Sequence, residues 1–525
     1  MRSAAKFLAS VLLATSVAVS ASGCVSLELN VARTPSSAYA GPPAESLSGL
    51  WEEQIAARPG SSGFRLVADG LEAFALRAML ARSAEHTLDI QYYIIHSDDT
   101  GTLLAHEVIR AADRGVRVRI LLDDIYAAEA DQTLLALDSH PSIEIRLFNP
   151  WRRRSGPMGR VIDFLASAGR LNQRMHNKLF AADGAAVVLG GRNIGDEYFV
   201  RDQDLDFRDL DVLAVGPVAR AASQSFDAYW NSEFSVPADA IQLRGGRPTI
   251  DEIRRFVDDH AVKMREGRYV RSIDSSPLAR EIARRQLIIE PATGSIVADD
   301  PDKLRRDGNT GRPDMITQMR EAMGEPERAL AISSPYFVPG REGVRLLASY
   351  EKRGVAVRVL TNSFAANDVP VVHVGYAKYR PALLRAGVEL FEFKRTNSED
   401  TDRRSERRFG SANASLHAKA MGIDGRWLFV GSLNFDPRSI VKNTEIGVVI
   451  DSTVLSTEAA AMFDYTTQPE SSYQVKLAPG SRSHLEWHST RNGQSVVDRT
   501  EPDTGWWRRL GFRLLRYVPF LEAQI

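Results

Sequence analysis

The sequence predicts an α/β fold built from two pseudo-symmetric halves, each a parallel or mixed sheet sandwiched between helices. Strand patterns alternate with helix patterns along the chain, and the same order of patterns recurs about 240 residues later. Each copy ends in the same spacing of polar residues. With 525 residues, of which 44% are apolar and 25% charged, the chain is long enough for two core-forming units.

The individual elements follow from residue periodicity. Alternating apolar and polar residues, or a short apolar run, predict a strand, whereas apolar residues three and four apart before a glycine predict a helix. In the first copy we expect strands at 86–95, 116–122 and 143–148 and a helix at 101–115. In the second copy we expect strands at 329–338, 355–361 and 388–393 and a helix at 340–354.

The repeated polar spacing reads His-x-Lys, four residues, Asp, six residues, Gly, Gly or Ser, one residue, Asn. It occurs in MHNKLFAADGAAVVLGGRN and in LHAKAMGIDGRWLFVGSLN. One such match could be accidental, but two matches in the same strand–helix context are not explained by chance. The paired positions are His176 and His417, Lys178 and Lys419, Asp183 and Asp424, and Asn193 and Asn434.

Each copy of this spacing fits a β-hairpin. Side chains two apart on a strand share a face, so His176 and Lys178 would point to the same side. The Asp-Gly pair that follows is a hairpin-turn dipeptide. Glycines at the end of the returning strand would let the backbone approach a ligand closely, and the asparagine would add an amide there. For Asp183 and Asp424, a chemical role and a purely turn-capping role have equal weight.

The doubled spacing resembles the phospholipase D superfamily. Further stretches are similar to its cardiolipin synthase C branch: QYYI near Gln91, RGVRVRILLDD near Arg114, TNSFAANDVPVVHVGYAKYR near Thr361 and SLNFDPRS near Ser432. The similarity extends from about Ser48 to the C-terminus. It implies a phospholipase D-type α/β/α sandwich with the active site at the interface of the two halves.

The resemblance also implies roles for the paired residues. His176, in the first half, is expected to attack phosphorus and form a covalent phosphohistidine, while His417 acts as acid and base. The pseudo-symmetry leaves the reverse assignment open. Lys178 and Lys419 would neutralise phosphate oxygens as compact point charges.

Carboxylates complete the candidate site. Asp183 and Asp424 belong to the repeated motif and count among the catalytic candidates. Aligning FRDLDVLAVG with VKNTEIGVVI pairs Asp211 with Glu445. These two are candidates for orienting the histidines, because an imidazole needs a partner to fix its tautomer. Capping or pairing on the sheet is an alternative of equal weight.

The branch resemblance implies a phosphatidyl transferase that makes cardiolipin from phosphatidylglycerol and a second phospholipid, with phosphatidylethanolamine as one donor to consider. Exchanging one phosphodiester for another needs no nucleotide, and no cofactor is expected. None of the ten histidines falls in a metal-ligand pattern such as HExxH, so no metal is expected. Three alternatives stay open: hydrolysis to phosphatidic acid, cleavage of nucleic acid by a superfamily nuclease, and lipid binding without catalysis.

Charge and motif content bear on partners. The net charge of −1 provides no global basic field, so a nucleic acid partner is not expected. Both motifs lie in one chain, so a monomer could hold a complete site. The need for a helper protein stays open.

The N-terminus predicts export and lipid anchoring. MRSAAKFLASVLLATSVAVSASGC has basic residues, an apolar stretch and small residues before Cys24, the single cysteine of the chain. This pattern is typical of a secretory signal and resembles a bacterial lipobox, in which Cys24 is acylated. An ordinary cleaved signal is the alternative. Val25 in place of Asp favours outer-membrane sorting, so we expect a lipid-anchored protein of the bacterial cell envelope, facing the periplasm on an anionic phospholipid membrane.

These patterns divide the chain into six segments. They are a signal peptide at 1–23, a flexible tether at 24–47, a first half at 48–240 with its motif at 171–198, a connecting segment at 241–325, a second half at 326–465 with its motif at 411–438, and a basic, aromatic C-terminal tail at 466–525. The tail ends in GWWRRLGFRLLRYVPFL, which fits either a membrane headgroup layer or a docked terminal helix. His373 fits a structural role better than a place in an acceptor pocket.

Overall fold

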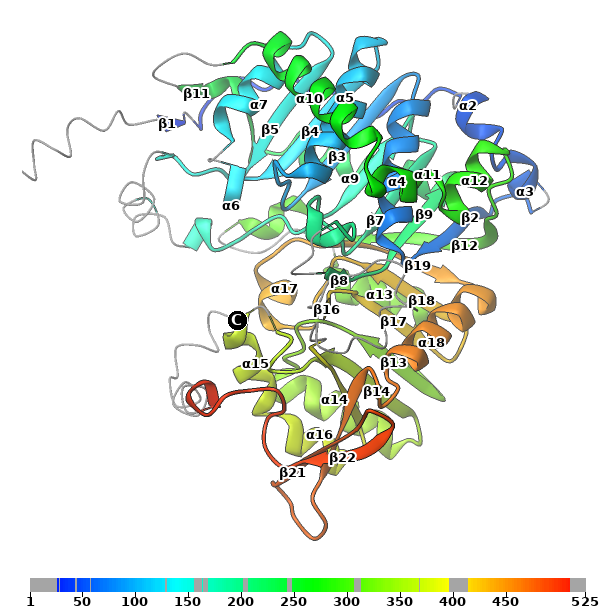
Figure 1. Ribbon diagram of the computed structural model, residues 1–525, viewed down its shortest axis with the longest axis vertical. Helices are drawn as coiled ribbons and strands as arrows, with labels where there is room; N and C mark the ends of the chain where they lie inside the picture. Colours follow the sequence, from blue (N-terminus) through cyan, green and yellow to red (C-terminus); the bar gives the residue numbers. More distant parts are fainter. Residues whose placement is uncertain are drawn as a thin grey trace, which may run out of the picture.

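The computed structural model describes residues 26–27, 29–42, 45–56, 58–127, 130–154, 163, 169–201, 206–242, 248–305, 313–367, 369–395 and 414–509. The signal peptide and Cys24 lie outside the described residues, as does the chain after Arg509. Two α/β bodies lie one above the other, with the first half uppermost (Figure 1). Among the helices described, none combines the length and the apolar character that crossing a bilayer requires.

The first half is built on one mixed sheet, ordered β10-β5-β4-β3-β6-β7-β9-β2. Its parallel strands are β3 (Thr87–Tyr92), β4 (Arg117–Asp123) and β5 (Ile143–Phe148). Its antiparallel strands are β2 (Ser62–Val67), β6 (Leu179–Ala182), β7 (Ala186–Gly190), β9 (Asp211–Val215) and β10 (Ser235–Pro237). The expected strands of the first copy are therefore present.

The second half repeats this arrangement, ordered β22-β21-β20-β15-β14-β13-β17-β18-β19. Its parallel strands are β13 (Ala329–Ser333), β14 (Ala356–Asn362) and β15 (Glu389–Phe393). Its antiparallel strands are β17 (Ala420–Ile423), β18 (Trp427–Gly431), β19 (Ile446–Asp451), β20 (Ser472–Leu477), β21 (Leu485–Arg491) and β22 (Gln494–Asp498). In both halves three parallel strands continue into the hairpin that carries the motif.

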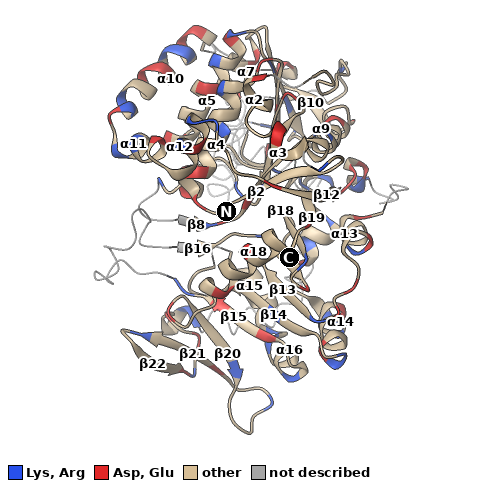
Figure 2. Ribbon diagram, turned by 90° about the vertical axis from the view of Figure 1, so that its right-hand side faces the viewer, with Lys and Arg blue, Asp and Glu red and all other residues tan. Residues whose placement is uncertain are grey.

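Strand pairing joins the two halves at two places. β12 (Glu290–Ala298) pairs first with β2 of the first half and then with β19 of the second half. Elsewhere β8 (Asp206–Arg208) pairs in parallel with β16 (Ala414–Leu416), and the two strands lie side by side between the halves (Figure 2). The chain that leads into the second motif is therefore bonded to the segment that follows the first motif.

Helices cover both faces of each sheet. On the first half, α4 (Gly70–Ser83), α5 (Asp99–Asp113) and α7 (Asp131–Asp138) cover one face, and α9 (Pro217–Trp230) covers the other. On the second half, α13 (Met315–Met323), α14 (Gly340–Lys352), α15 (Pro370–Ala377) and α16 (Arg380–Ala386) lie opposite α18 (Thr453–Thr466). The predicted duplicated α/β/α sandwich is confirmed.

The core between the halves is apolar and continuous. Phe226 and Trp230 of α9 share one buried cluster with Val430, Ile446 and Val448 of the second half. In the connecting segment, α10 (Ile250–Arg265), α11 (Arg268–Asp274) and α12 (Pro277–Ala283) pack on α4 and α5. The connecting segment therefore adds a layer to the first half.

Residues 29–42 do not form the flexible tether that their composition predicts. Their carbonyl oxygens accept hydrogen bonds from buried arginines, with Arg119 donating to Ser36 at 3.1 Å and Arg146 to Thr34 at 2.6 Å. The ring of Tyr39 stacks on His86 at 4.2 Å. The segment is bound along the first half because partners on distant strands hold its backbone.

Residues 466–525 were predicted as a tail, but the described part extends the second sheet. β20 pairs with β15, and β21 and β22 continue from it. The basic, aromatic stretch begins at Trp506 and Trp507, which are 59% and 76% exposed. The tail prediction is therefore wrong for 472–498.

Candidate active site

The two motifs bring their histidines to the interface between the halves. His176 lies just before β6, and His417 lies between β16 and β17. The backbone N–H of His176 donates to the carbonyl of Thr444 at 2.9 Å, and that of His417 donates to the carbonyl of Arg208 at 2.7 Å. Because both bonds cross the interface, the position of each histidine is fixed by the opposite half.

A carboxylate from the opposite half also orients each imidazole. Nδ1 of His176 lies 2.9 Å from Oε2 of Glu445, and Nδ1 of His417 lies 2.5 Å from Oδ2 of Asp209. When Nδ1 is engaged in this way, Nε2 is the nitrogen left to face a substrate. The crossed pairs mean that neither half alone carries a complete site.

Glu445 occupies the position expected from the sequence, but the expectation for Asp211 is wrong. Nη2 of Arg77 lies 2.9 Å from the Asp211 carboxylate, and Nη1 of Arg192 lies 3.4 Å from it. Asp211 thus holds buried arginines of the first half. The carboxylate that reaches His417 is Asp209, two residues earlier.

Strand register explains this two-residue difference. The last residue of β7 pairs with Asp211, whereas the last residue of β18 pairs with Gly447. Asp211 is therefore equivalent to Gly447, and the carboxylates two residues before them, Asp209 and Glu445, form the equivalent pair. The ungapped sequence alignment placed the second carboxylate of FRDLD opposite Glu445 and missed the first.

The Gly-Gly and Gly-Ser positions of the motif serve the orienting carboxylates. A Cβ at Gly191 would lie 2.2 Å from Oδ1 of Asp209, so glycine at this position leaves room for the carboxylate where it lies. In the second copy Ser432 takes the same place, and its hydroxyl donates to Glu445 at 2.5 Å. The close approach expected for a ligand is thus made here by the chain's own carboxylates.

Lys178 and Lys419 are buried beside the histidines. Nζ of Lys178 donates to the carbonyl of His176 at 2.7 Å, and Lys419 makes the same bond to His417. Burial lowers the pKa of Lys178 to about 7, although Glu445 acts in the opposite direction. Two buried ammonium groups in one space favour the binding of an anion such as phosphate.

The two histidines differ in their electrostatic surroundings. Burial, followed by the two lysines, lowers the pKa of His176 well below 6.5. Burial and a lysine also lower the pKa of His417, but Asp209 opposes this shift. Burial raises the pKa of Glu445 to about 7. Burial also acts to raise the pKa of Asp209, but His417, Lys419 and Arg192 together hold the pKa of that carboxyl below its usual range. His176 is the more firmly neutral imidazole, and His417 faces an ionised carboxylate.

Asp183 and Asp424 lie at the far end of the motif hairpins. Each lies seven positions after its histidine along mostly extended chain, a span on the order of 20 Å. Asp183 accepts the backbone N–H groups of residues 85–87 at 2.7 to 3.0 Å, and Asp424 accepts those of residues 327–329 at 2.8 to 3.0 Å. Their assignment as catalytic candidates is corrected: both carboxylates cap the start of the first parallel strand of their half.

The motif asparagines are buried near the site. Nδ2 of Asn193 donates to the hydroxyl of Tyr198 at 2.8 Å, and the Tyr198 ring lies edge-on to His417 at 5.3 Å. Among the described residues, Oδ1 of Asn193 and Oδ1 of Asn434 have no hydrogen-bond partner. Both asparagines stay supporting candidates.

Sequence reasoning missed several residues around the histidines. Tyr93 lies edge-on to His176 at 5.0 Å, and Nζ of Lys178 lies 5.3 Å from the centre of its ring. Asp123 accepts the backbone N–H of Met175 at 2.9 Å and so fixes the residue before the histidine. Tyr93 lies in QYYI and Asp123 in RGVRVRILLDD, both of which were noted in the sequence. Neither stretch has a fixed spacing to the motif that would have linked it to the histidines.

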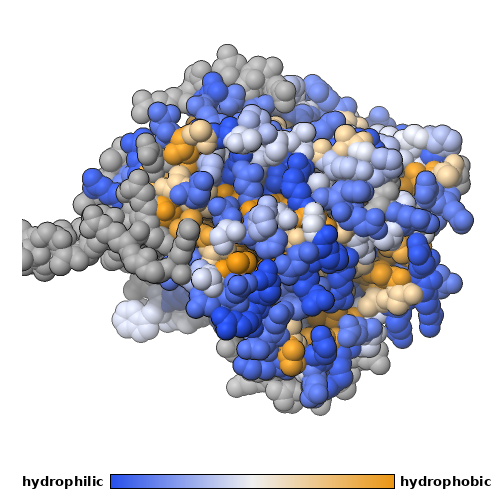
Figure 3. All heavy atoms as spheres, turned by 90° about the horizontal axis from the view of Figure 1, so that it is seen from above, coloured by the Kyte–Doolittle hydropathy of each residue, from blue (hydrophilic) through white to orange (hydrophobic). Residues whose placement is uncertain are grey.

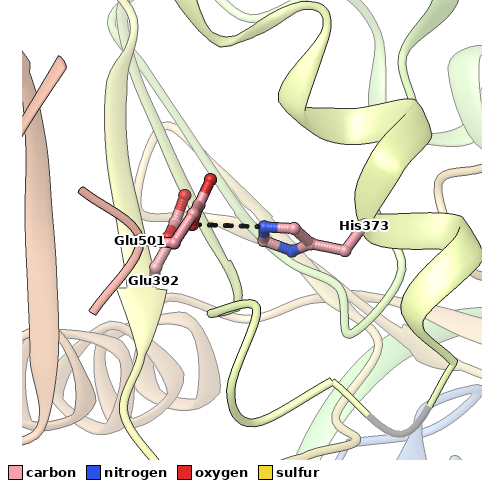
Figure 4. Close-up of side chains that lie close together, drawn as sticks. All are labelled: His373, Glu392 and Glu501. Carbon is pink, nitrogen blue, oxygen red and sulfur yellow. Dashed lines mark ion pairs between the residues drawn. The ribbon is translucent and has the colours of Figure 1, made fainter. Parts of the chain in front are cut away.

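His373 belongs to a buried polar cluster outside the histidine pair. Its side chain faces Glu392 and Glu501 (Figure 4), and together these three residues are of the kinds that ligate metals. The guanidinium of Arg380 supplies a cation there: Nη2 lies 2.7 Å from His373 and 2.8 Å from Glu501, and Nε lies 3.4 Å from Glu392. The cluster ties the C-terminal segment to α15, α16 and β15, which fits the structural role expected for His373.

A family model described as "Cardiolipin synthase, PLD-like domain" matches residues 77–230 and 319–467. The chain belongs to the cardiolipin synthase family of the phospholipase D superfamily. Both matched segments contain one complete motif. The chain is 41% identical over 463 residues to cardiolipin synthase C of Escherichia coli (strain K12), an alignment that covers 88% of this chain and 96% of that protein.

Two further comparisons extend this family relationship. An uncharacterized protein of Helicobacter pylori (strain ATCC 700392 / 26695) is 31% identical, with 88% of this chain and 90% of that protein covered. The crystal structure of phosphatidylserine synthase from Haemophilus influenzae Rd KW20 covers 91% of this chain and 98% of its own, with a TM-score of 0.54 and 13% identity. At this identity the likeness shows a shared fold across both halves.

Substitutions of Asp209 and Asp183 should have contrasting effects on kcat. Asp209→Asn should lower kcat about 100-fold or more, because His417 loses the charge that stabilises its protonated form. Asp183→Ala should destabilise the protein by about 2 kcal/mol through three lost backbone hydrogen bonds, yet keep the kcat of the folded fraction. Turnover and thermal melting of both variants check this, and a loss of kcat in folded Asp183→Ala would contradict the capping role.

The lowered pKa of Lys178 should make the stability of the protein depend on pH. Between about pH 7, the pKa of Lys178 in the folded protein, and 10.5, its ordinary pKa, the unfolded chain binds the proton and the folded site does not. The free energy of unfolding should therefore rise with pH across this window, by at most about 1.4 kcal/mol per pH unit. Lys178→Met should lack this rise and be at least as stable as the parent at pH 7. Denaturant titrations at pH 7 and pH 9.5 measure both slopes, and equal slopes would refute the shift.

Proposed function

We propose that the protein transfers a phosphatidyl group from a phospholipid donor to the free hydroxyl of phosphatidylglycerol and so forms cardiolipin. The crossed histidine–carboxylate pairs with two buried lysines carry this proposal, because they place two separately tuned imidazoles beside two lysines that can bind a phosphate. The likeness to cardiolipin synthase C of Escherichia coli along 96% of that protein supports the choice of substrate class.

In the first step Nε2 of His176 attacks the phosphorus of the donor. A P–N bond forms, the P–O bond to the headgroup alcohol breaks, and protonated His417 gives its Nε2 proton to the leaving oxygen. Neutral His176 suits the nucleophile, since its pKa is the more strongly lowered of the two. Lys178 and Lys419 neutralise the phosphate oxygens during attack.

In the second step the hydroxyl of phosphatidylglycerol replaces the headgroup. His417 takes the hydroxyl proton as the oxygen attacks phosphorus, and the P–N bond to His176 breaks. Ionised Asp209 stabilises His417 each time it is protonated. Bond energies of the two phosphodiesters nearly balance, so these residues need no nucleotide to drive the exchange.

Lipid products test the proposal directly. Purified protein with phosphatidylglycerol vesicles, with and without phosphatidylethanolamine, should form cardiolipin, and His176→Ala and His417→Ala should each lose activity by at least about 1000-fold. Dependence on phosphatidylethanolamine would name the donor. Phosphatidic acid in place of cardiolipin would make water the acceptor and contradict the transferase, and a requirement for a second protein would appear as activity restored by cell extract.

We also propose that the protein is held at the membrane of the cell envelope through acylated Cys24. The signal-like N-terminus supports this, and the exposed Trp506 and Trp507 beside Arg508 suit the headgroup region of an anionic bilayer. In a Gram-negative host, labelled palmitate should enter the parent and not Cys24→Ser, and the parent should fractionate with the outer membrane. Equal labelling of both would refute lipidation at Cys24.

A further inference from the structure

An apolar cavity of about 360 Å³ lies inside the first half, between the sheet and its outer helices. Strands β3 to β5 form its floor, and α5, α7 and α10 form its walls and roof, which Figure 1 shows stacked above those strands. The lining includes Ile90, Val108, Leu134, Ile145, Ile194 and Ile253. Its volume lies within the range of about 300–1,000 Å³ that is usual for small-ligand sites.

One end of the cavity adjoins the histidine pair. Tyr93 lines the cavity, and its ring also lies edge-on to His176 at 5.0 Å. Asp123 lines the cavity as well, and its carboxylate holds the backbone of Met175 next to that histidine. A molecule whose phosphorus sits at His176 therefore has an apolar space within reach on the first-half side.

The roof of the cavity is held by polar contacts along its edges. Helix α10 carries charged residues along its outer side (Figure 2) and is joined to α5 by ion pairs, with His106 lying 2.9 Å from Asp258 and Arg254 lying 2.8 Å from Asp113. Phe256 of α10 lines the cavity and is 61% exposed. Seen from above, apolar patches interrupt the hydrophilic surface (Figure 3). The cavity is thus mostly apolar within, and Phe256 extends from its lining to the surface.

We propose that this cavity binds one fatty acyl chain of the phospholipid whose phosphate is bound at His176. The inference rests on the proposed function, and it assigns a binding site to the acyl chain, which the histidine pair does not contact. An acyl chain is long, unbranched and without hydrogen-bonding groups, so a cavity with a mostly apolar lining suits it, whereas a sugar–phosphate backbone would leave polar groups unpaired there. The substrate is thereby anchored by its chain as well as by its phosphate.

Filling the cavity tests this inference. Ala105 on α5 lines the cavity and is partly exposed, so Ala105→Trp places an indole in existing space. Mixed micelles of dioleoyl and of dihexanoyl phosphatidylglycerol provide a long-chain and a short-chain substrate. The ratio of kcat/KM for the long chain to that for the short chain should fall about tenfold or more, since each methylene kept out of the cavity loses its burial.

A matched control separates this effect from a general disturbance. Ala221 is a partly exposed alanine on α9, on the opposite face of the sheet, and Ala221→Trp should leave the ratio unchanged. An unchanged ratio in Ala105→Trp, or an equal fall in Ala221→Trp, would overturn the inference while leaving the proposed reaction intact.

A binding measurement without turnover tests the acyl site separately from the proposed reaction. His176→Ala should bind a pyrene-labelled fatty acyl phosphatidylglycerol, and adding Ala105→Trp to it should weaken that binding about tenfold. Such a result supports the acyl site even if the parent protein makes no lipid product, in which case only the proposed reaction fails. Equal binding by both variants would exclude the cavity as the acyl site.

Discussion

The structure depends on one constraint: two histidines and two lysines are buried in the interface, and each histidine is oriented by a carboxylate of the other half. His176 is held by Glu445 and His417 by Asp209, and backbone hydrogen bonds cross at the same points. Burying a charge without a partner costs free energy, so the two halves must pack correctly for the charged groups of the site to be paired. The shared strand β12 and the apolar core around α9 hold the two halves together.

The duplication is symmetric in backbone and asymmetric in charge. Gly191 leaves room for Asp209, which stays ionised beside His417, whereas Ser432 donates to Glu445, whose pKa burial raises to about 7. Equivalent positions thus give one imidazole a firm negative partner and the other a weaker one. Two copies of one unit thereby gain different electrostatic surroundings without different folds, and the proposed roles of nucleophile and acid–base rest on that difference.

Local pattern predicted the strands, the helices and the duplicated sandwich because each depends on neighbours in sequence. The repeated spacing likewise located His176 and His417, although both lie just before the motif hairpins and not on their strands. It failed for Asp211, because the orienting carboxylate is set by cross-strand register, and for Asp183 and Asp424, whose partners begin strands nearly a hundred residues away in the sequence. Residues 29–42 bind buried arginines that no local pattern reveals.

The most direct measurement is to trap the covalent intermediate. A phosphatidyl donor with a labelled acyl chain would be mixed with the parent, with His417→Gln and with His176→Gln, quenched within the first turnover and mapped by mass spectrometry at neutral to alkaline pH, where phosphohistidine survives. The account predicts phosphatidyl label on the peptide containing His176 in the parent and none in His176→Gln. Label on His417 in the parent, with the His176 peptide unlabelled, would contradict it.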